Sequence, residues 1–313
     1  MKKVLKTLII LSFFICCKNI FAKELILFPV SPMERIIDNK IISESEAMER
    51  ASVDGIKIFG SPGQYVPASF VIYPTLEKIE NVLIEIGNLI SADTKKNILS
   101  SNIDDYVVKC WYSPVCDMWG TVRKYEYLPE LLLKDDSLIE VDHSVRMNKT
   151  VFENELPIIH ERIKPFPLKK GIMKQIWLVI HIPENSTPGS YTGVIRVKAG
   201  DLSESIKLQL DVLNIKLANP LADFGIFFPE SLLDSSLDYY RLMLKNMAAH
   251  GVNFAYIITP MFDEKKFEAG DFSELKKYID IWKEEGILTK RAVLPDTYLT
   301  HMIWASIGKK ELP

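Results

Sequence analysis

The segment 205–212 alternates apolar and polar side chains without a break, and this alternation constrains the fold more than any other feature. In an extended chain its apolar positions share one face and its polar positions the other: Ile206, Leu208, Leu210 and Val212 against Lys207, Gln209 and Asp211. A period of two with one polar face is typical of a strand half-buried in an antiparallel sheet. The segment therefore predicts a sheet that packs one of its faces on a core.

Similar patterns recur along the first two thirds of the chain. Strands are predicted around Val82, Ile84 and Ile86 and over 68–73, 106–112, 175–182 and 191–197. Turn signals separate them at 61–63 and 185–189, where Pro188-Gly189 predicts a hairpin connection. Short strands with frequent turns favour a mostly β sandwich over 23–219, interrupted by a less regular insertion at about 120–167.

The pattern changes after Pro220, where strands and helices begin to alternate. Short apolar runs predict buried parallel strands at 224–228, 253–259 and 287–294, separated by helices at about 237–250 and 272–286. Ser236 and Asp271 have the position and chemistry of helix caps. This alternation predicts βα units on a parallel sheet.

Two closed architectures contain such units, a doubly wound sheet and a (β/α)8 barrel. No Gly-x-Gly-x-x-Gly follows the first strand, which removes the strongest sign of a dinucleotide-binding sheet. A barrel takes ~250 residues, and 92 remain from Ala222 to Pro313. We therefore expect 220–313 to form the first βα units of an incomplete (β/α)8-type barrel.

The first 22 residues have the layout of a secretory signal peptide. Lysines at positions 2, 3 and 6 precede an apolar run over 8–17, and Ala22 supplies a small residue at the cleavage point. The run is shorter than the ~20 residues that a membrane-spanning helix needs. Bulky neighbours disfavour a lipoprotein site at Cys16 or Cys17. We expect a periplasmic or extracellular protein that begins near Lys23 and keeps no stable membrane span.

Charge and cysteine content narrow the classes of function. The net charge of −3 provides no electrostatic basis for binding nucleic acid. Beyond the signal only Cys110 and Cys116 occur, and they are either a small disulfide loop or two buried apolar side chains. Too few ligands lie nearby for a zinc site, so we expect neither a metal nor a cofactor.

An ordered series of motifs resembles glycoside hydrolase family 123 and its relatives. The matching stretches lie between about Phe59 and Thr259: Tyr65–Ile72, Val107–Tyr112, Tyr127–Asp136, Gln175–Pro183, the Pro-Gly-x-Tyr-x-Gly turn of Pro188–Ile195, and Tyr239–Asn253. The resemblance implies an accessory β-sandwich followed by a barrel that cleaves β-linked amino sugars, as a β-N-acetylhexosaminidase does. It also implies an adjacent Asp-Glu pair, with the acetamido group of the substrate as nucleophile.

Asp263-Glu264 is the one Asp-Glu dipeptide in the sequence, and it follows the second predicted barrel strand. The catalytic pair of the family comes from a later strand, and the lysines after Glu264 suit a solvated loop, so a charged surface turn is the favoured interpretation. Glu230 and Asp296 follow the first and third predicted strands. Carboxylates at these positions either contact sugar hydroxyls or cap helices.

Trp111, Tyr112 and Trp119 cluster near the cysteines, and core packing is favoured there over stacking on a sugar ring. The leading hypothesis is an exported glycoside hydrolase-like protein directed at a glycan or glycoconjugate. This chain is expected to lack the catalytic residues and not to hydrolyse glycosides. The alternative is a non-catalytic extracytoplasmic β-sandwich that binds glycans or an envelope partner.

Overall fold

The chain divides into two units, which are described separately. Unit 1 is Met1–Leu217 and unit 2 is Ala218–Pro313. The computed structural model describes residues 23–117, 121–151, 160–218, 223–226, 236–255, 269–271 and 273–287.

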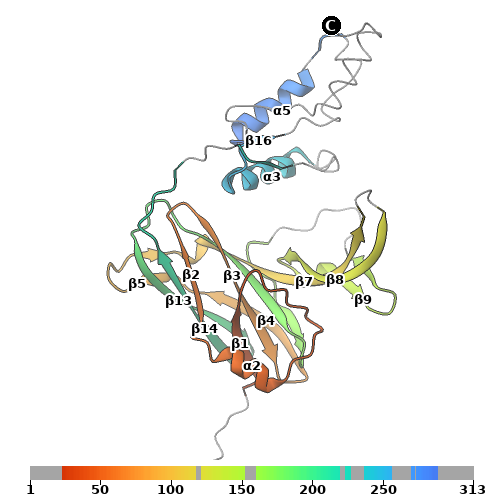
Figure 1. Cartoon of the computed structure of the whole chain (residues 1–313), viewed down its shortest axis with the longest axis vertical. Coiled ribbons are helices and arrows are strands. Elements are labelled where there is room, and N and C mark those ends of the chain that lie inside the picture. The colour runs from red at the N-terminus through yellow and green to blue at the C-terminus, as the bar shows by residue number, and fades with distance from the viewer. Residues whose placement is uncertain are drawn as a thin grey trace, which may run out of the picture. The chain divides into compact units, whose positions relative to one another are not determined.

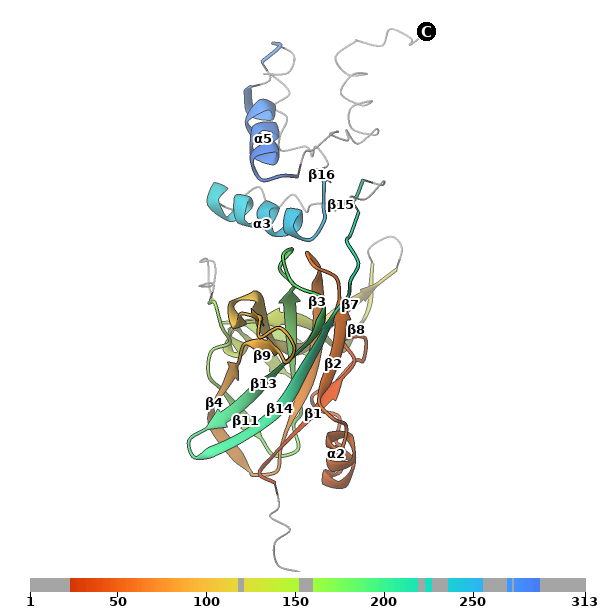
Figure 2. The same cartoon turned by 90° about the vertical axis from the view of Figure 1, so that its left-hand side faces the viewer.

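Two β-sheets pack face to face in unit 1 (Figures 1 and 2). The five-stranded sheet is antiparallel and runs in the order β1 (Leu25–Val30), β3 (Tyr65–Pro74), β12 (Lys174–His181), β7 (Ile103–Cys116) and β8 (Val122–Leu133). The seven-stranded sheet runs in the order β11 (Phe166–Lys169), β4 (Lys78–Ile86), β13 (Gly189–Ala199), β14 (Leu202–Val212) and β2 (Ile56–Gly60). Its two remaining strands are β5 (Leu89–Ser91), which pairs with β13, and β6 (Asn97–Ile98), which pairs with β5.

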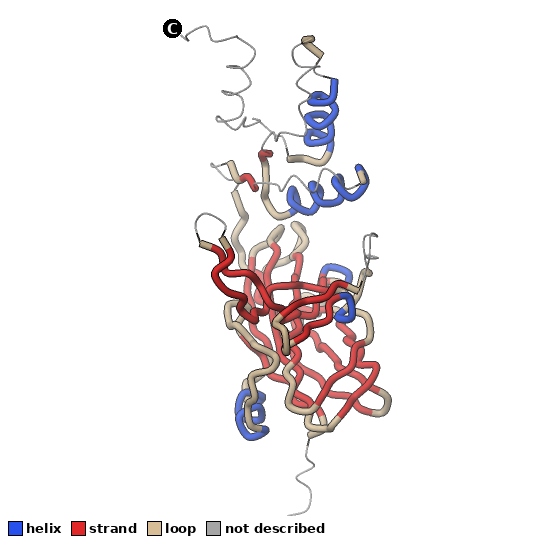
Figure 3. The backbone as a smooth tube through the Cα atoms, turned by 90° about the vertical axis from the view of Figure 1, so that its right-hand side faces the viewer, coloured by secondary structure: helices blue, strands red, loops and turns tan. Residues whose placement is uncertain are grey.

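An apolar core fills the space between the sheets. Alternate residues of the strands supply it, for example Leu208 and Leu210 of β14 and Leu178 and Ile180 of β12. The intervening residues of β14 are polar and face outward, as the alternation predicted. The mostly β fold predicted for this region is confirmed, and strands dominate the tube of unit 1 in Figure 3.

A short helix and the loop before it cover the outer face of the five-stranded sheet. α2 (Glu44–Ala51) buries Ala47, and residues of the preceding loop pack with it against Phe28 and Tyr73. The Ser43 hydroxyl accepts from the Glu46 amide and caps the helix. This helix was not predicted from the sequence, because its apolar stripe is too short to show a helical period.

Two parts of unit 1 differ from the sequence prediction. The Pro188-Gly189 turn does not close a hairpin, since β12 before it and β13 after it belong to different sheets. The insertion at about 120–167, expected to be less regular than the strands around it, contains β8 and a hairpin of β9 (Ile139–Asp142) and β10 (Met147–Thr150). Short 3₁₀ turns lie at η1 (Ser100–Asn102) and η2 (Asp136–Leu138).

The β7–β8 hairpin is longer than the sheet that it joins. β12 pairs with β7 over Ile103–Val107, so the remainder of the hairpin extends beyond the sandwich, as the yellow strands of Figure 1 show. The side-chain amide of Asn148 on β10 replaces a neighbouring strand at this edge. It accepts from the Tyr112 amide at 2.8 Å and donates to the Tyr112 carbonyl at 2.7 Å.

Unit 2 contains a βαβ arrangement. β15 (Gly225–Ile226) and β16 (Phe254–Ala255) pair in parallel, and α3 (Leu237–Ala249) lies between them in the chain. Ser236 caps α3 as predicted, since its hydroxyl accepts from the amide of Tyr239. α5 (Ser273–Glu284) contacts α3 through Trp282, whose indole Nε1 donates to the Tyr240 hydroxyl at 2.7 Å.

The described part of unit 2 agrees with the prediction of βα units but does not establish a barrel. Phe224 and Ile226, predicted to be buried, are 54% and 45% exposed. The predicted strand at 287–294 lies outside the described residues except for Ile287, and the predicted signal at 1–22 lies outside them entirely. None of the described helices has both the length and the apolar character needed to cross a membrane.

Candidate functional site

The carboxylates singled out in the sequence lie outside the described residues. This holds for Asp263-Glu264, the weak candidates for a catalytic pair, and for Glu230 and Asp296, the candidate sugar contacts. Trp119 also falls outside them. The roles assigned to these residues therefore stay predictions.

The two cysteines are free thiols on one strand, which corrects the suggestion of a disulfide loop. Cys110 is buried and Cys116 is exposed at the end of β7. Six residues of extended chain separate them by roughly 20 Å, whereas a disulfide needs Cα atoms within ~7 Å. Burial, together with the nearby Asp38 carboxylate, raises the pKa of the Cys110 thiol to about 12. Cys110 therefore fits the alternative of a buried apolar side chain. Cys116 does not, because it is exposed.

The predicted aromatic cluster is divided by the strand that carries it. Trp111 and Tyr112 are neighbours on β7, so their side chains leave opposite faces of the hairpin. The Trp111 Nε1 donates to Glu130 Oε2 at 2.9 Å. Tyr112 packs against Tyr127, with ring centroids 5.2 Å apart, and against His143 at 5.8 Å. These contacts favour packing over a platform for a sugar ring.

A hollow on the outer face of the seven-stranded sheet offers a more coherent site. It forms where β4 ends at Ile86 and β5 begins at Leu89, so that Gly87 and Asn88 leave the regular ladder beside β13. The Gly87 amide still donates to the Val194 carbonyl at 3.1 Å. The Asn88 Oδ1 accepts from the Ser100 amide at 2.8 Å, which fixes the displaced loop.

Gly193 allows the two chains to approach this closely. A Cβ at this position would lie 2.7 Å from Leu89 Cδ2 and 2.8 Å from the Asn88 carbonyl oxygen. Neither distance is compatible with a side chain, and a backbone carbonyl has little freedom to move. The glycine is therefore required by a close approach of backbone, and its own φ is not in the left-handed region.

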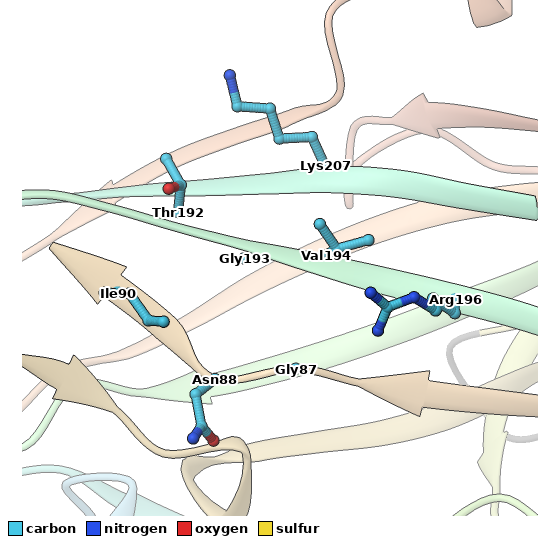
Figure 4. Close-up of a pocket in the computed structure, with 8 residues that line it drawn as sticks. All are labelled: Gly87, Asn88, Ile90, Thr192, Gly193, Val194, Arg196 and Lys207. Carbon is cyan, nitrogen blue, oxygen red and sulfur yellow. The ribbon is translucent and has the colours of Figure 1, made fainter. Parts of the chain in front are cut away.

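The hollow has a volume of about 410 Å³ and is lined by eight residues: Gly87, Asn88, Ile90, Thr192, Gly193, Val194, Arg196 and Lys207. Alternate residues of β13 supply Thr192, Val194 and Arg196, because successive side chains of a strand leave opposite faces. Ile90 on β5 pairs with Thr192, and Lys207 on β14 pairs with Val194. Figure 4 shows these side chains on the two sides of β13.

The lining carries positive charge and no carboxylate. Within the described residues, Arg196 forms no ion pair; Glu85, its cross-strand neighbour, binds Lys198 at 2.7 Å instead. Lys207 has one carboxylate neighbour, Asp54, at 3.9 Å. The hollow thus combines two cations, a hydroxyl and two apolar side chains, a set that suits a polar, negatively charged ligand.

The sequence analysis missed this hollow. The alternation of 205–212 did place Lys207 on the polar face. The hollow, however, forms where the break at Gly87-Asn88 lies beside β13, and these two segments are about 100 residues apart in the sequence. An isolated glycine in a strand pattern, here Gly193, was the one local signal of close backbone approach.

Comparison with known proteins supports the fold rather than an activity. No protein-family model matches the sequence, and no curated protein matches it. Among solved structures, this chain is similar to a family 123 glycoside hydrolase from Clostridium perfringens, studied for glycolipid glycan hydrolysis, with a TM-score of 0.59 and 15% identity. The match covers 87% of this chain, which is more than unit 1, so the likeness extends into unit 2. The chain spans 48% of that enzyme, about half its length.

Two other solved structures match less well. One is AvmM, which catalyses macrocyclization in alchivemycin A biosynthesis, with a TM-score of 0.26, 11% identity, and coverage of 53% of this chain and 93% of that one. The other is MyfA, the major fimbrial subunit of Yersinia enterocolitica, in complex with galactose, with a TM-score of 0.24, 11% identity, and coverage of 60% and 98%. Scores this low do not define a shared fold. The likeness to the family 123 enzyme does, and it concerns the fold alone.

Proposed function

We propose that this protein is an exported, carbohydrate-active protein of the glycoside hydrolase 123-like type. In this proposal unit 1 is the accessory β-sandwich and unit 2 belongs to a (β/α)8 barrel. The observation that carries the proposal is the fold likeness, with a TM-score of 0.59 over 87% of the chain. The ordered sequence motifs from Tyr65 to Asn253 support it independently of the fold.

The proposed ligands are glycans or glycoconjugates that contain β-linked amino sugars. Catalysis by the complete arrangement would need a carboxylic acid that protonates the leaving oxygen and a second carboxylate that orients the acetamido group. We do not assign these roles to Asp263 and Glu264, because the corresponding pair of the family follows a later strand. The signal peptide predicted at 1–22 supports a proposed location in the periplasm or outside the cell.

A second candidate is glycan binding without catalysis, and the hollow on the seven-stranded sheet favours it. Hydroxyl, amide and cationic groups surround the apolar side chains of Ile90 and Val194 there. This combination is typical of sites that bind a polar ligand by a few directed groups over an apolar surface.

The test uses the mature chain, residues 23–313, on an array of immobilised glycans, together with chromogenic β-N-acetylhexosaminides. Retention on glycans with terminal or internal N-acetylhexosamine, without turnover above background, is the expected result. Failure to retain any glycan would overturn the proposal. Turnover that disappears in Asp263→Asn or Glu264→Gln would instead show that the pair is catalytic and that our interpretation of it is wrong.

A further inference from the structure

The hollow on the seven-stranded sheet contains two cations and, in the described part of the chain, only one nearby counter-charge, the exposed Asp54, which lies 3.9 Å from Lys207. Arg196 has no ion-pair partner within the described residues, although a carboxylate lies on the neighbouring strand. That carboxylate, Glu85, is directly opposite Arg196 in the strand register but forms its ion pair with Lys198. An exposed cation without a partner, such as Arg196, costs little in water, and the long, exposed contact between Lys207 and Asp54 contributes little, so both cations are available to a ligand.

We propose that the hollow binds an acidic glycan, a chain whose sugars carry carboxylate groups. This inference rests on the proposed function, since it specifies which glycan the accessory unit takes. Arg196 presents a planar guanidinium that matches a carboxylate with two parallel hydrogen bonds, and Lys207 adds a point charge. No carboxylate of the lining would repel such a ligand.

The placement of the two cations indicates an extended ligand rather than a single small anion. In Figure 4 the Arg196 head group and the Lys207 ammonium lie on opposite sides of Val194. One inorganic ion would therefore contact one cation at a time. An oligosaccharide with acidic groups on separate sugars can engage both, and the intervening sugar then lies over Val194.

The remaining lining suits the sugar between two acidic groups. Val194 and Ile90 are exposed apolar side chains, which pack against the C–H face of a pyranose ring. The Thr192 hydroxyl lies on the same face of β13 and both donates and accepts hydrogen bonds. A volume of about 410 Å³ holds one or two sugars, so longer chains would continue over the open sheet face.

The experiment compares two hexasaccharides that differ in charge, a hyaluronan hexasaccharide and chitohexaose. Both contain β-linked N-acetylglucosamine, and the hyaluronan oligomer also carries a glucuronate on every second sugar. Binding to the full chain is measured by isothermal titration calorimetry at low and high salt. The double variant Arg196→Gln/Lys207→Gln removes the two cations, and Arg35→Gln/Lys169→Gln removes the same charge from exposed positions elsewhere.

The inference requires that hyaluronan bind more tightly than chitohexaose and that its affinity fall by about tenfold in Arg196→Gln/Lys207→Gln, with a smaller salt dependence. The Arg35→Gln/Lys169→Gln control should bind like the wild type. Equal losses in both double variants would reduce the effect to net charge and overturn the inference. Equal binding of both oligosaccharides, unaffected by the hollow variant, would overturn it as well, yet leave the proposed function standing. If neither these oligosaccharides nor any glycan on the array binds, both fail.

Discussion

Removal of the Asp136 carboxylate should strongly destabilise unit 1. Asp136 begins η2 and lies between Lys109 of β7 and Lys174 of β12. Lys174 Nζ donates to Asp136 Oδ2 at 3.0 Å, and Lys109 Nζ lies 3.3 Å from Oδ1 and donates to the Asp136 carbonyl at 2.9 Å. The three side chains are 14%, 14% and 9% exposed, in the order Lys109, Asp136 and Lys174, so water screens them little.

Asp136→Asn keeps the shape of the side chain and leaves two lysines without a counter-charge. Breaking a buried ion pair in this way costs about 3–5 kcal/mol, because the remaining charges stay desolvated. In a domain of this size each kcal/mol lowers Tm by about 2–4 °C, so we expect Tm to fall by roughly 6–20 °C. Replacing all three charged side chains with apolar ones of similar volume should lower the stability of unit 1 much less.

The pH dependence follows from the pKa of Asp136. Burial alone would raise this pKa, but the charges of Lys174 and Lys109 outweigh burial and hold it below its ordinary value. A folded-state pKa below the unfolded one means that the stabilisation is fully present above about pH 4 and is lost as the pH falls through the folded pKa. The difference in stability between wild type and Asp136→Asn should therefore be constant near neutral pH and shrink in acid.

Thermal unfolding followed by circular dichroism at a series of pH values measures both effects. Asp93→Asn is the matched control, since it makes the same change at an exposed position between β5 and β6. Our reasoning is refuted if the two variants unfold at the same temperature at neutral pH. It is also refuted if the deficit of Asp136→Asn stays constant down to the lowest pH at which the wild type is folded.

Three further predictions concern the chain as a whole. Without denaturant, iodoacetamide should label Cys116 and spare Cys110, because Cys110 is buried and its thiol pKa is raised. Mass spectrometry measures the labelling. If neither thiol is labelled after unfolding without reductant, the two cysteines form a disulfide. Limited proteolysis should leave a fragment that ends near Leu217, the boundary between the units, and a stable fragment that extends well beyond it would contradict their independence. In a Gram-negative host the mature protein should begin near Lys23, which N-terminal sequencing checks, and an intact Met1 would be the contrary result.

The sequence predicted the strands of the core well because their burial is periodic. β12, β13 and β14 coincide with the predicted segments to within a few residues. α3 was equally clear, since Ser236 caps it and Gly251 adopts a φ of 90° just beyond its end. In each case one local rule, alternation or capping, was sufficient.

The sequence prediction was wrong or silent where local pattern and pairing disagree. β8 carries Pro129 and has side chains partly exposed on both faces, so neither composition nor period marks it as a strand. The start of α2 does carry a local signal, because Ser43-Glu44-Ser45-Glu46 has the pattern of a capping box. The Pro188-Gly189 turn was recognised as a turn, but its local chemistry does not specify which sheets it joins.

The hollow shows why a candidate site on a sheet face escapes sequence reasoning even when its residues are noticed. Alternation assigns Lys207 to the solvent face, where a lone cation has no special meaning. The site exists because Gly193 lets the backbone at Asn88 come so close that a Cβ would overlap it. The break at Gly87-Asn88 separates β4 from β5 beside β13 and opens the space that the cations line. A side chain at 193 would press on Leu89, which is fully buried, and would therefore disturb the core and the hollow together. The requirement for glycine thus links the packing of the sandwich to the binding proposed on its surface.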